Sequence, residues 1–254
     1  MRFVTAVLVL AALAAGTVPA RAQTRQTGTL RIIVRDPSGA ALPRSSRRGS
    51  STKGAEMGKT IMGAVVSLDG FMADDNDGVG PLFDWLGNGD VAWSFPGSDG
   101  ESRTTQASAD FMLDVYGDMA ANVIGRRVFD MTNGWNGKPA AGEHVFVVTH
   151  RPPTDWEYAD TAPFTFVDGV EKAITAAKEF AGDRVVDVAA GQIGGQALRL
   201  GLIDQVVVNQ VPVVFGSGRP FFATGGLAEP LRLENPTTIV RGDRVTHLLY
   251  DVSR

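Results

Sequence analysis

The sequence predicts a three-layer α/β domain, with a central and mostly parallel β-sheet covered by helices on both faces. Apolar, strand-like runs alternate along the chain with segments of helical periodicity, which is the pattern typical of parallel sheets. Residues 61–68 (IMGAVVSL) are almost wholly apolar, as expected for a strand buried on both faces. Residues 239–240 and 245–252, joined at Gly242-Asp243, predict an antiparallel pair of strands at the C-terminal end.

The expected elements between these ends follow in order along the chain. Residues 69–100 are rich in Gly, Asp and Asn and predict a long loop of the kind that forms binding loops or lids. Asp168 and Glu171 have the spacing of a helix N-cap and its capping-box partner. The other expected elements are a helix capped by Thr104 or Thr105, strands at 122–125, 144–149, 185–188 and 205–211, a helix from 168 to Gly182, and a short helix at 193–200.

Composition and charge argue against several classes of protein. The formal net charge of −4 and the lack of a basic stripe argue against nucleic-acid binding. The chain contains no cysteine, which excludes disulfides, thiolate metal sites and cysteine nucleophiles. No two of the three histidines have the spacing of metal ligands, so we expect no metal site.

The N-terminal segment differs from the rest of the chain in its composition and sequence pattern. Residues 1–22 have the layout of a secretory signal peptide, and residues 23–56 combine one strand-like stretch with a basic Gly/Ser-rich linker. The strand-like stretch resembles the start of carboxypeptidase-regulatory-like modules, without the further strands of a sandwich. We therefore expect residues 57–254 to be the functional domain. The encoded N-terminus indicates export, with no membrane association once the signal peptide is removed. A start near Met57 would instead indicate a cytoplasmic protein.

Four segments, taken together, resemble the dihydrofolate-reductase-like superfamily, in the branch of the riboflavin-biosynthesis pyrimidine reductase domain. They are SLDGFMA (Ser67–Ala73), VIGRRVFD (Val123–Asp130), VVTHRP (Val147–Pro152) and the long run Val188–Gly218, which contains GLIDQ and PVVFGSG. The resemblance extends from Lys59 to the C-terminus. It implies a dihydrofolate-reductase-like sheet and hydride transfer from NADPH to a small heterocyclic, phosphoribosylamino-pyrimidine or pterin-type substrate. It also implies a homodimer.

Arginines beside a glycine are the clearest candidates for cofactor binding. Gly125-Arg126-Arg127 lies at an expected strand-to-helix junction. Glycine there lets the backbone approach a phosphate closely, and an arginine guanidinium can bind two oxygens of that phosphate at once. The resemblance assigns Arg126 to the 2′-phosphate of NADPH, and Arg151 beside it would favour NADPH over NADH. The remaining cofactor contacts implied by the resemblance come from Ala64, Val65, Thr149, His150, Gly191, Gln192, Ile193 and Gly194.

Two positions depart from the pattern of that superfamily. Its members usually have Thr where this chain has Val128, and many have Gly-Gly where it has Ala189-Ala190. Loss of the threonine hydroxyl is expected to weaken cofactor binding by about 0.5–1.5 kcal/mol. Gly194 and the following Gly195 have a second interpretation, which is close packing of the helix on the sheet.

The candidate catalytic residues are Asp69 and Asp110, each with a structural alternative. Asp69 either orients the substrate or holds a turn through its own backbone. Asp110 either lies in a buried cleft and transfers protons, or belongs to the solvent-exposed face of its helix. Trp85 and Trp93 either stack on a planar substrate or form a small core. Two rival functions are weak dihydrofolate reductase activity and an exported, non-catalytic binding module.

Overall fold

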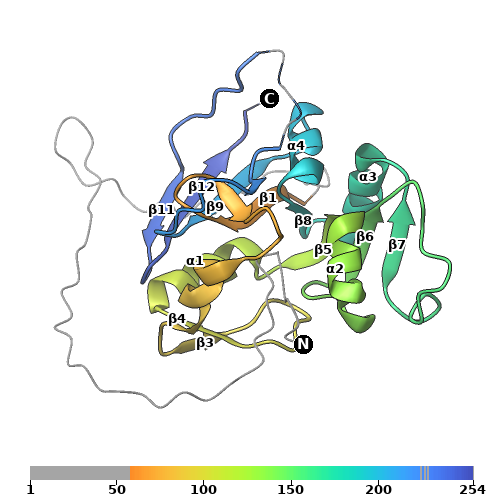
Figure 1. Cartoon of the computed structure of the whole chain (residues 1–254), viewed down its shortest axis with the longest axis horizontal. Coiled ribbons are helices and arrows are strands. Elements are labelled where there is room, and N and C mark those ends of the chain that lie inside the picture. Colours follow the sequence, from red (N-terminus) through yellow and green to blue (C-terminus); the bar gives the residue numbers. More distant parts are fainter. Residues whose placement is uncertain (1–57, 224, 226, 228, 254) are drawn as a thin grey trace, which may run out of the picture. The chain divides into compact units, whose positions relative to one another are not determined.

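The computed structural model describes residues 58–223, 225, 227 and 229–253. The expected signal peptide at 1–22 and the segment 23–56 lie outside the described residues. The described part contains an eight-stranded sheet in the order β11-β12-β9-β1-β8-β5-β6-β7. Strands β11 and β7 form its two opposite edges, as the ribbon shows (Figure 1).

Six adjacent strands of this sheet are parallel, and the two at the β11 edge are antiparallel. The predicted fold class, an α/β domain with a mostly parallel sheet and antiparallel C-terminal strands, is therefore confirmed. The parallel strands are β1 Thr60–Val66, β5 Met119–Gly125, β6 His144–Val148, β7 Phe164–Val167, β8 Val185–Ala189 and β9 Gln205–Gln210, and the antiparallel strands are β11 Thr238–Arg241 and β12 Thr246–Asp251.

Four α-helices, one 3-10 helix and two small two-stranded sheets complete the described part. β2 pairs with β10 and β3 pairs with β4, in both cases antiparallel. Their bounds are α1 Gln106–Tyr116, α2 Arg126–Asn136, α3 Val170–Ala181, α4 Gln192–Arg199, η1 Gly80–Gly87, β2 Phe71–Ala73, β3 Val91–Trp93, β4 Ser102–Thr104 and β10 Arg219–Pro220.

Strand β1 lies at the centre of the sheet, and its continuous apolar sequence follows from that place. All seven residues of β1 are buried, because β8 and β9 flank the strand and helices cover both faces. Side chains alternate between faces along a strand, so Ile61 and Val65 join one apolar cluster and Met62 and Ala64 join the other. Burial of each such aliphatic side chain contributes about 1.5–3 kcal/mol.

The two apolar clusters assign each helix to one face of the sheet. The first cluster includes Phe111 of α1 and Phe129 of α2. The second includes Ile174 of α3 and Leu198 of α4. Helices therefore cover both faces, as predicted, and each helix that follows a parallel strand begins at the edge where that strand ends.

Helix α1 begins where the sequence predicts. The Thr105 hydroxyl accepts a hydrogen bond from the Ser108 amide at 3.3 Å, so Thr105 is the N-cap. Phe111 and Val115 are buried, as are Ser108 and Ala109, whereas Ala107 is exposed.

Two expected elements differ from those in the structure. The N-cap of α3 is Gly169 and has no side-chain hydrogen bond, so the predicted capping box of Asp168 and Glu171 is wrong. The Asp168 carboxylate instead pairs with His150, which follows β6. Residues 69–100 are not one long loop either, because β2, η1 and β3 lie within them. β2 pairs with β10 far along the chain, and β3 pairs with the nearby β4.

Candidate functional site

Three helices begin at the edge of the sheet where the parallel strands end. Helix α2 follows β5, α3 follows β7 and α4 follows β8, and their N-caps are Gly125, Gly169 and Gly191. None of these N-caps forms a side-chain hydrogen bond to its helix. Because the first amides of a helix carry partial positive charge and point outward, this edge favours an anionic ligand. We call it the strand edge.

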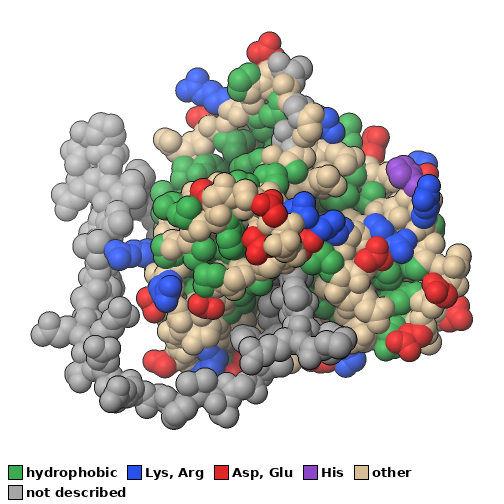
Figure 2. Space-filling model, in the orientation of Figure 1, with side chains coloured by type: hydrophobic (Ala, Val, Ile, Leu, Met, Phe, Trp, Pro, Cys, Tyr) green, Lys and Arg blue, Asp and Glu red, His purple; other side chains and the backbone are tan. Residues whose placement is uncertain are grey.

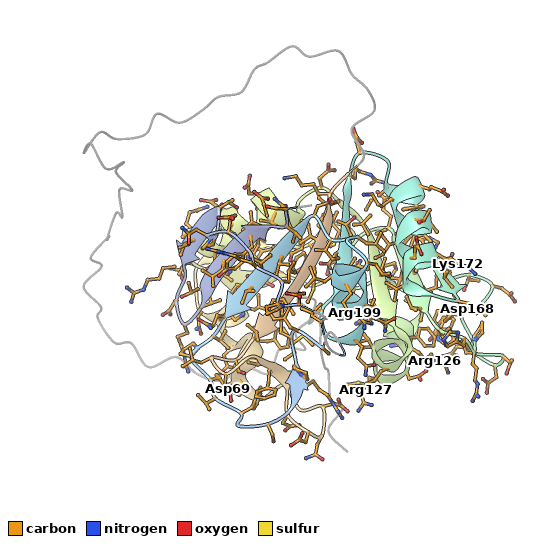
Figure 3. The ribbon with its side chains drawn as sticks, turned by 90° about the horizontal axis from the view of Figure 1, so that it is seen from above. Asp69, Arg126, Arg127, Asp168, Lys172 and Arg199 are labelled. Atoms are coloured by element: carbon orange, nitrogen blue, oxygen red, sulfur yellow. The ribbon has the colours of Figure 1, made fainter. Side chains whose placement is uncertain are left out.

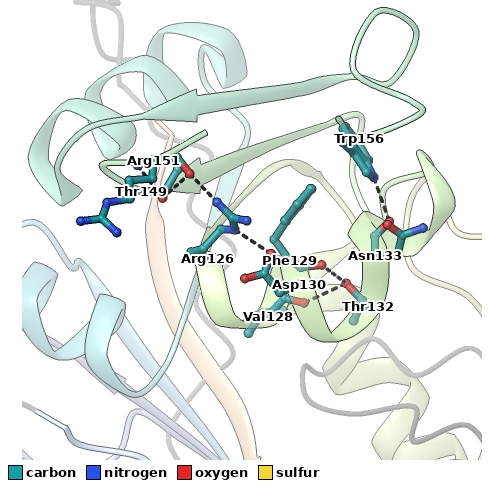
Figure 4. Close-up of polar contacts among 9 residues, drawn as sticks. All are labelled: Arg126, Val128, Phe129, Asp130, Thr132, Asn133, Thr149, Arg151 and Trp156. Atoms are coloured by element: carbon teal, nitrogen blue, oxygen red, sulfur yellow. Dashed lines mark hydrogen bonds and ion pairs between the residues drawn. The ribbon is translucent and has the colours of Figure 1, made fainter. Parts of the chain in front are cut away.

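Arg126 is the first residue of α2 and lies between two neighbours at the strand edge (Figure 4). Its Nε donates to the Asp130 carboxylate one turn later at 2.6 Å, and its Nη1 donates to the Arg151 carbonyl. The Thr149 hydroxyl accepts from the Arg151 amide at 3.1 Å and so turns the chain after β6 toward Arg126. The structure thus brings together three of the predicted cofactor residues, Arg126, Thr149 and Arg151.

His150 and Arg151 lie at the end of β6 beside Arg126. The His150 side chain is exposed and its Nδ1 pairs with the carboxylate of Asp168 at the end of β7. Within the described residues, the Arg151 guanidinium has no polar partner. In the view of Figure 3, Asp168 and Lys172 at the start of α3 are drawn on the same side of the molecule as Arg126 at the start of α2. The end of β6 therefore carries solvent-facing cations beside one carboxylate.

Arg127, the next residue of α2, binds a different partner from Arg126. Its Nε donates to Asp77 Oδ1 at 3.1 Å, and its Nη2 donates to the second oxygen of the same carboxylate. Arg219 of β10 also donates to Asp77 Oδ1, at 2.8 Å. The Arg127 guanidinium is the first cause of a lowered pKa for Asp77, and Arg219 adds to it. This Arg219 contact was not predicted, because no local motif marks residue 219.

The loop before α4 contains the remaining predicted cofactor residues. Gly191 has a left-handed φ of +78°, which favours glycine, and its amide donates to the Phe221 carbonyl at 2.8 Å. Gln192 is exposed, and Ile193 packs against Gly125, where an added Cβ would lie 3.1 Å from Ile193. Gly194 is buried against Met62 with no room for a Cβ, which supports its second interpretation as a helix-packing residue.

The predicted nicotinamide-flanking residues lie inside the sheet. The side chains of Ala64 and Val65 are buried on opposite faces of β1. Next to them, Gly63 has the Tyr116 hydroxyl of α1 directly over it, and an added Cβ would lie 2.1 Å from that oxygen. The backbone of β1, rather than any side chain, is therefore what this strand could offer a ligand.

Asp69 holds a loop in place. Its carboxylate accepts from the amides of Phe215 and Gly216, the latter at 2.7 Å, and from the Ser67 hydroxyl at 2.6 Å. The Ser67 hydrogen bond is the first cause of its lowered pKa, followed among the favourable causes by those two amides. Asp69 is therefore ionised at neutral pH and shapes the mouth of the loop 213–217.

The structure does not place Asp110 in a buried cleft. Its side chain is exposed on α1 and accepts a hydrogen bond from Gln106 at 2.7 Å. Trp85 and Trp93 are both buried in the first apolar cluster, and Trp93 donates to the Thr104 hydroxyl at 3.0 Å. Both tryptophans therefore belong to the core, which was the alternative to stacking on a substrate.

Buried polar groups form two clusters beneath α1. His247 of β12 is fully buried, with Nδ1 2.7 Å from Asn209 Oδ1 and Nε2 2.9 Å from Ser108 Oγ. An amide oxygen only accepts, so Nδ1 carries the proton and Nε2 accepts from the serine. Burial lowers the pKa of His247 to about 4.

The second cluster surrounds Asp187 of β8. Asp187 pairs in register with Asn122 of β5, and both side chains are buried with an oxygen that has no hydrogen-bond partner. The Tyr116 hydroxyl is likewise buried without a partner. Burial raises the pKa of Asp187 to about 8, so its carboxyl group is mostly protonated at neutral pH.

Charges on the surface are mixed in sign. Basic and acidic side chains lie beside one another across the face shown in Figure 2. Within the described ranges, no group of three or more His, Cys, Asp or Glu residues is placed to hold a metal ion. Of the helices in the described part of the chain, none is long and apolar enough to span a bilayer.

Comparisons with known proteins give relatives of low identity and a shared fold. No family model matches the chain. The uncharacterized protein YwjB of Bacillus subtilis is 24% identical over 166 residues, which cover 65% of this chain and 82% of YwjB. A solved structure from Shewanella sp. PV-4, whose name provisionally places it in riboflavin biosynthesis, has a TM-score of 0.56 at 23% identity and covers 77% of this chain and 99% of that one.

Two further solved structures cover a similar share of the chain. A pyrimidine reductase-like protein of Corynebacterium diphtheriae has a TM-score of 0.53 at 14% identity, covering 78% of this chain and 93% of its own. A diaminohydroxyphosphoribosylaminopyrimidine deaminase/5-amino-6-(5-phosphoribosylamino)uracil reductase of Thermotoga maritima has a TM-score of 0.53 at 15% identity, and the match covers 57% of that longer chain. The chain therefore has the dihydrofolate-reductase-like fold, which it shares with these pyrimidine-reductase-like proteins.

Proposed function

We propose that the chain is an NADPH-dependent reductase that transfers hydride to a small heterocyclic substrate of the phosphoribosylamino-pyrimidine or pterin type. The observation that carries the proposal is the strand edge, where three glycine-led helices begin without side-chain caps beside Arg126 and Arg151. The names of proteins with the same fold, which include a phosphoribosylaminouracil reductase, support the substrate class.

The residues at the strand edge fit a dinucleotide with several phosphates. The uncapped start of α4, led by Gly191, would hold the pyrophosphate through its first amides. Arg126 and the exposed Arg151 would bind the 2′-phosphate, since guanidinium groups pair with phosphate oxygens in bidentate fashion. The backbone of β1 at Ala64 and Val65 would flank the nicotinamide, which would supply the hydride when bound.

The protein's own contribution to the reaction would be orientation of the two reactants. Asp69 is ionised at neutral pH and bound to loop amides, so it shapes the substrate loop and does not donate a proton. Asp110 lies on an exposed helix face. Holding two reactants in a productive geometry can by itself account for about 7–11 kcal/mol of a barrier. The proposal therefore requires no protein nucleophile.

A comparison of NADPH with NADH tests the proposal on the full chain. Loss of the Arg126 guanidinium removes charge-assisted hydrogen bonds worth about 1.5–3 kcal/mol, or at least about tenfold in affinity. We expect Arg126→Ala to weaken NADPH by about that factor and to leave NADH nearly unchanged, as measured by fluorescence titration. Arg199→Ala, an exposed arginine in the last turn of α4, is the matched control and should bind both cofactors as wild type does.

Two outcomes would contradict parts of this proposal. Equal loss of NADPH and NADH affinity in Arg126→Ala would show that Arg126 does not bind the 2′-phosphate. A folded wild-type chain that binds neither cofactor would exclude the reductase and favour the rival, a non-catalytic binding module. If NADPH binds, the turnover rates of dihydrofolate and of a phosphoribosylamino-pyrimidine can be compared. The faster substrate distinguishes a dihydrofolate reductase from a pyrimidine reductase.

A further inference from the structure

One carboxylate of the chain lies between two arginines that come from distant segments. Asp77 belongs to the loop after β2, Arg127 begins α2, and Arg219 lies in β10. Asp77 Oδ1 accepts from Arg127 Nε at 3.1 Å and from Arg219 Nε at 2.8 Å, and Oδ2 accepts from Arg127 Nη2. An arginine fork binds carboxylates and phosphates in the same bidentate geometry, and here it is satisfied by the carboxylate of Asp77.

The exposure of the three side chains shows which of them a ligand can reach. The Asp77 side chain is 17% exposed, whereas Arg127 is 60% and Arg219 is 44% exposed. Arg127 and Arg219 bring two positive charges to the single carboxylate of Asp77, while the neighbouring carboxylates of Asp74 and Asp75 are hydrogen-bonded to backbone amides and to the Ser217 hydroxyl. An anion of higher charge than a carboxylate would be attracted to the same guanidinium groups.

The loop that carries Asp77 forms a tight turn that holds the Asp77 carboxylate toward the two arginines. Asp77 has a left-handed φ of +65°, which few residues other than glycine adopt. The Asp74 carboxylate accepts from the amides of Asn76 and Gly78, both at 2.8 Å, and so closes a tight turn around Asp77. The Asp75 carbonyl accepts from Arg219 Nη2 at 3.1 Å, which joins this turn to β10.

We propose that Arg127 and Arg219 form a binding site for a phosphate ester, which Asp77 occupies when the ligand is absent. This inference rests on the proposed function, because the ligands of such a reductase bring phosphates as part of the cofactor or of a phosphoribosyl substrate. A phosphate monoester carries a charge of about −1.5 to −2 with three acceptor oxygens, against one charge and two oxygens for Asp77. The ester therefore displaces Asp77 from the arginines.

This phosphate site is separate from the one proposed for the 2′-phosphate. Successive residues of a helix diverge by about 100°, so Arg126 reaches the chain after β6 and Arg127 reaches the loop after β2. Figure 3 shows Arg126 and Arg127 leaving the same helix, with Arg127 on the side of Asp69 in that view. The start of α2 thus serves two anions, one on each side.

Titration calorimetry of the full chain with ribose 5-phosphate tests the site, with ribose as the phosphate-free control. Asp77→Asn removes the competing charge, and asparagine tolerates the left-handed backbone. We expect it to bind ribose 5-phosphate about five- to tenfold more tightly than wild type, a change of roughly one log unit or 1.4 kcal/mol. Arg219→Gln should bind it at least about tenfold more weakly, since it loses a charge-assisted pair.

Matched controls separate this site from general charge effects. Asp99→Asn removes an exposed carboxylate that pairs with Lys138, and Arg199→Gln removes an exposed arginine elsewhere. Both controls should bind ribose 5-phosphate as wild type does. Thermal unfolding of each variant verifies that it is folded. If folded Asp77→Asn and Arg219→Gln bind the ester as wild type does, the site is excluded.

The same variants identify which ligand brings the phosphate. If Arg219→Gln binds NADPH as wild type does but binds ribose 5-phosphate more weakly, the site belongs to the substrate. A parallel loss of NADPH affinity assigns it to the pyrophosphate of the cofactor, and either result supports the site. The wild type could also bind no NADPH while the two variants still change the affinity for ribose 5-phosphate. That result would support the phosphate site and exclude only the proposed reductase.

Discussion

Polar side chains are used in opposite ways beneath α1 and at the strand edge. Beneath α1, His247, Ser108 and Asn209 are buried and hydrogen-bonded to one another across three elements. At the strand edge, Arg126 and Arg127 are partly or largely exposed and are paired with the carboxylates of Asp130 and Asp77. An unpaired polar group is costly only where water cannot reach it. The first region should therefore govern stability and the second should govern binding.

The largest effect on stability is expected from His247→Ala. The substitution removes the partner of the Asn209 amide oxygen and the acceptor of the Ser108 hydroxyl proton. It also opens a cavity against Phe111, whose ring centroid lies 4.8 Å from that of the imidazole. We expect a loss of about 3–5 kcal/mol in the free energy of unfolding, measured with denaturant. The exposed His150→Ala should change it little, and similar losses in both variants would refute the contrast between the two regions.

A smaller, pH-dependent effect is expected from Asp187. Its pKa is raised from 3.8 to about 8 by burial, so its contribution to stability is full below pH 3.8 and is lost as the pH rises to about 8. The pKa of His247 is lowered from 6.5 to about 4, so its contribution is full above pH 6.5 and is lost toward pH 4. The two trends oppose each other at acidic pH, and only that of Asp187 acts above pH 6.5.

Stability curves between pH 6.5 and 8 isolate the Asp187 contribution. The wild-type free energy of unfolding should fall by about 2 kcal/mol over this range, at 1.36 kcal/mol for each pH unit. Asp187→Asn should abolish the fall, because an amide does not ionise and its nitrogen can donate to the unpaired Asn122 oxygen. Asp183→Asn, an exposed neighbour, should keep the wild-type slope, and loss of the slope there would contradict the assignment.

The smallest effect on stability is expected from Arg127→Gln at the strand edge. Exposed ion pairs contribute about 0–1 kcal/mol, so the denaturation midpoint should move little although Arg127 pairs with Asp77. The same variant should bind ribose 5-phosphate at least about tenfold more weakly, as Arg219→Gln does. A large stability loss without a change in binding would reverse the roles of the two regions.

Local patterns in the sequence predict the layers of this fold but not its long-range pairs. The apolar run at 61–68 identifies the central strand, and Thr105 identifies the start of α1. The capping box at Asp168 failed because His150, from the preceding strand, binds that carboxylate. The sequence of residues 69–100 gives no sign of β2, because the partner strand β10 lies almost 150 residues later.

The candidate site shows the same limit. Gly125, Arg126 and Arg127 adjoin one another in the sequence and could be identified from their local pattern. Arg219 stands alone in the sequence and meets Arg127 only through the fold. Asp110 was placed by its position on a helix, and the exposed face of that helix is set by tertiary packing, which spacing alone does not determine.

The contact between Gly63 and Tyr116 has a consequence for how the sequence can vary. The hydroxyl of Tyr116 fills the space where a side chain at position 63 would lie, only 2.1 Å from a Cβ there. Substitutions at positions 63 and 116 therefore depend on each other. Alanine at position 63 is disruptive when position 116 is tyrosine and acceptable when it is phenylalanine. In a combinatorial library, surviving sequences should show this pairing as covariation between the centre of β1 and the last residue of α1.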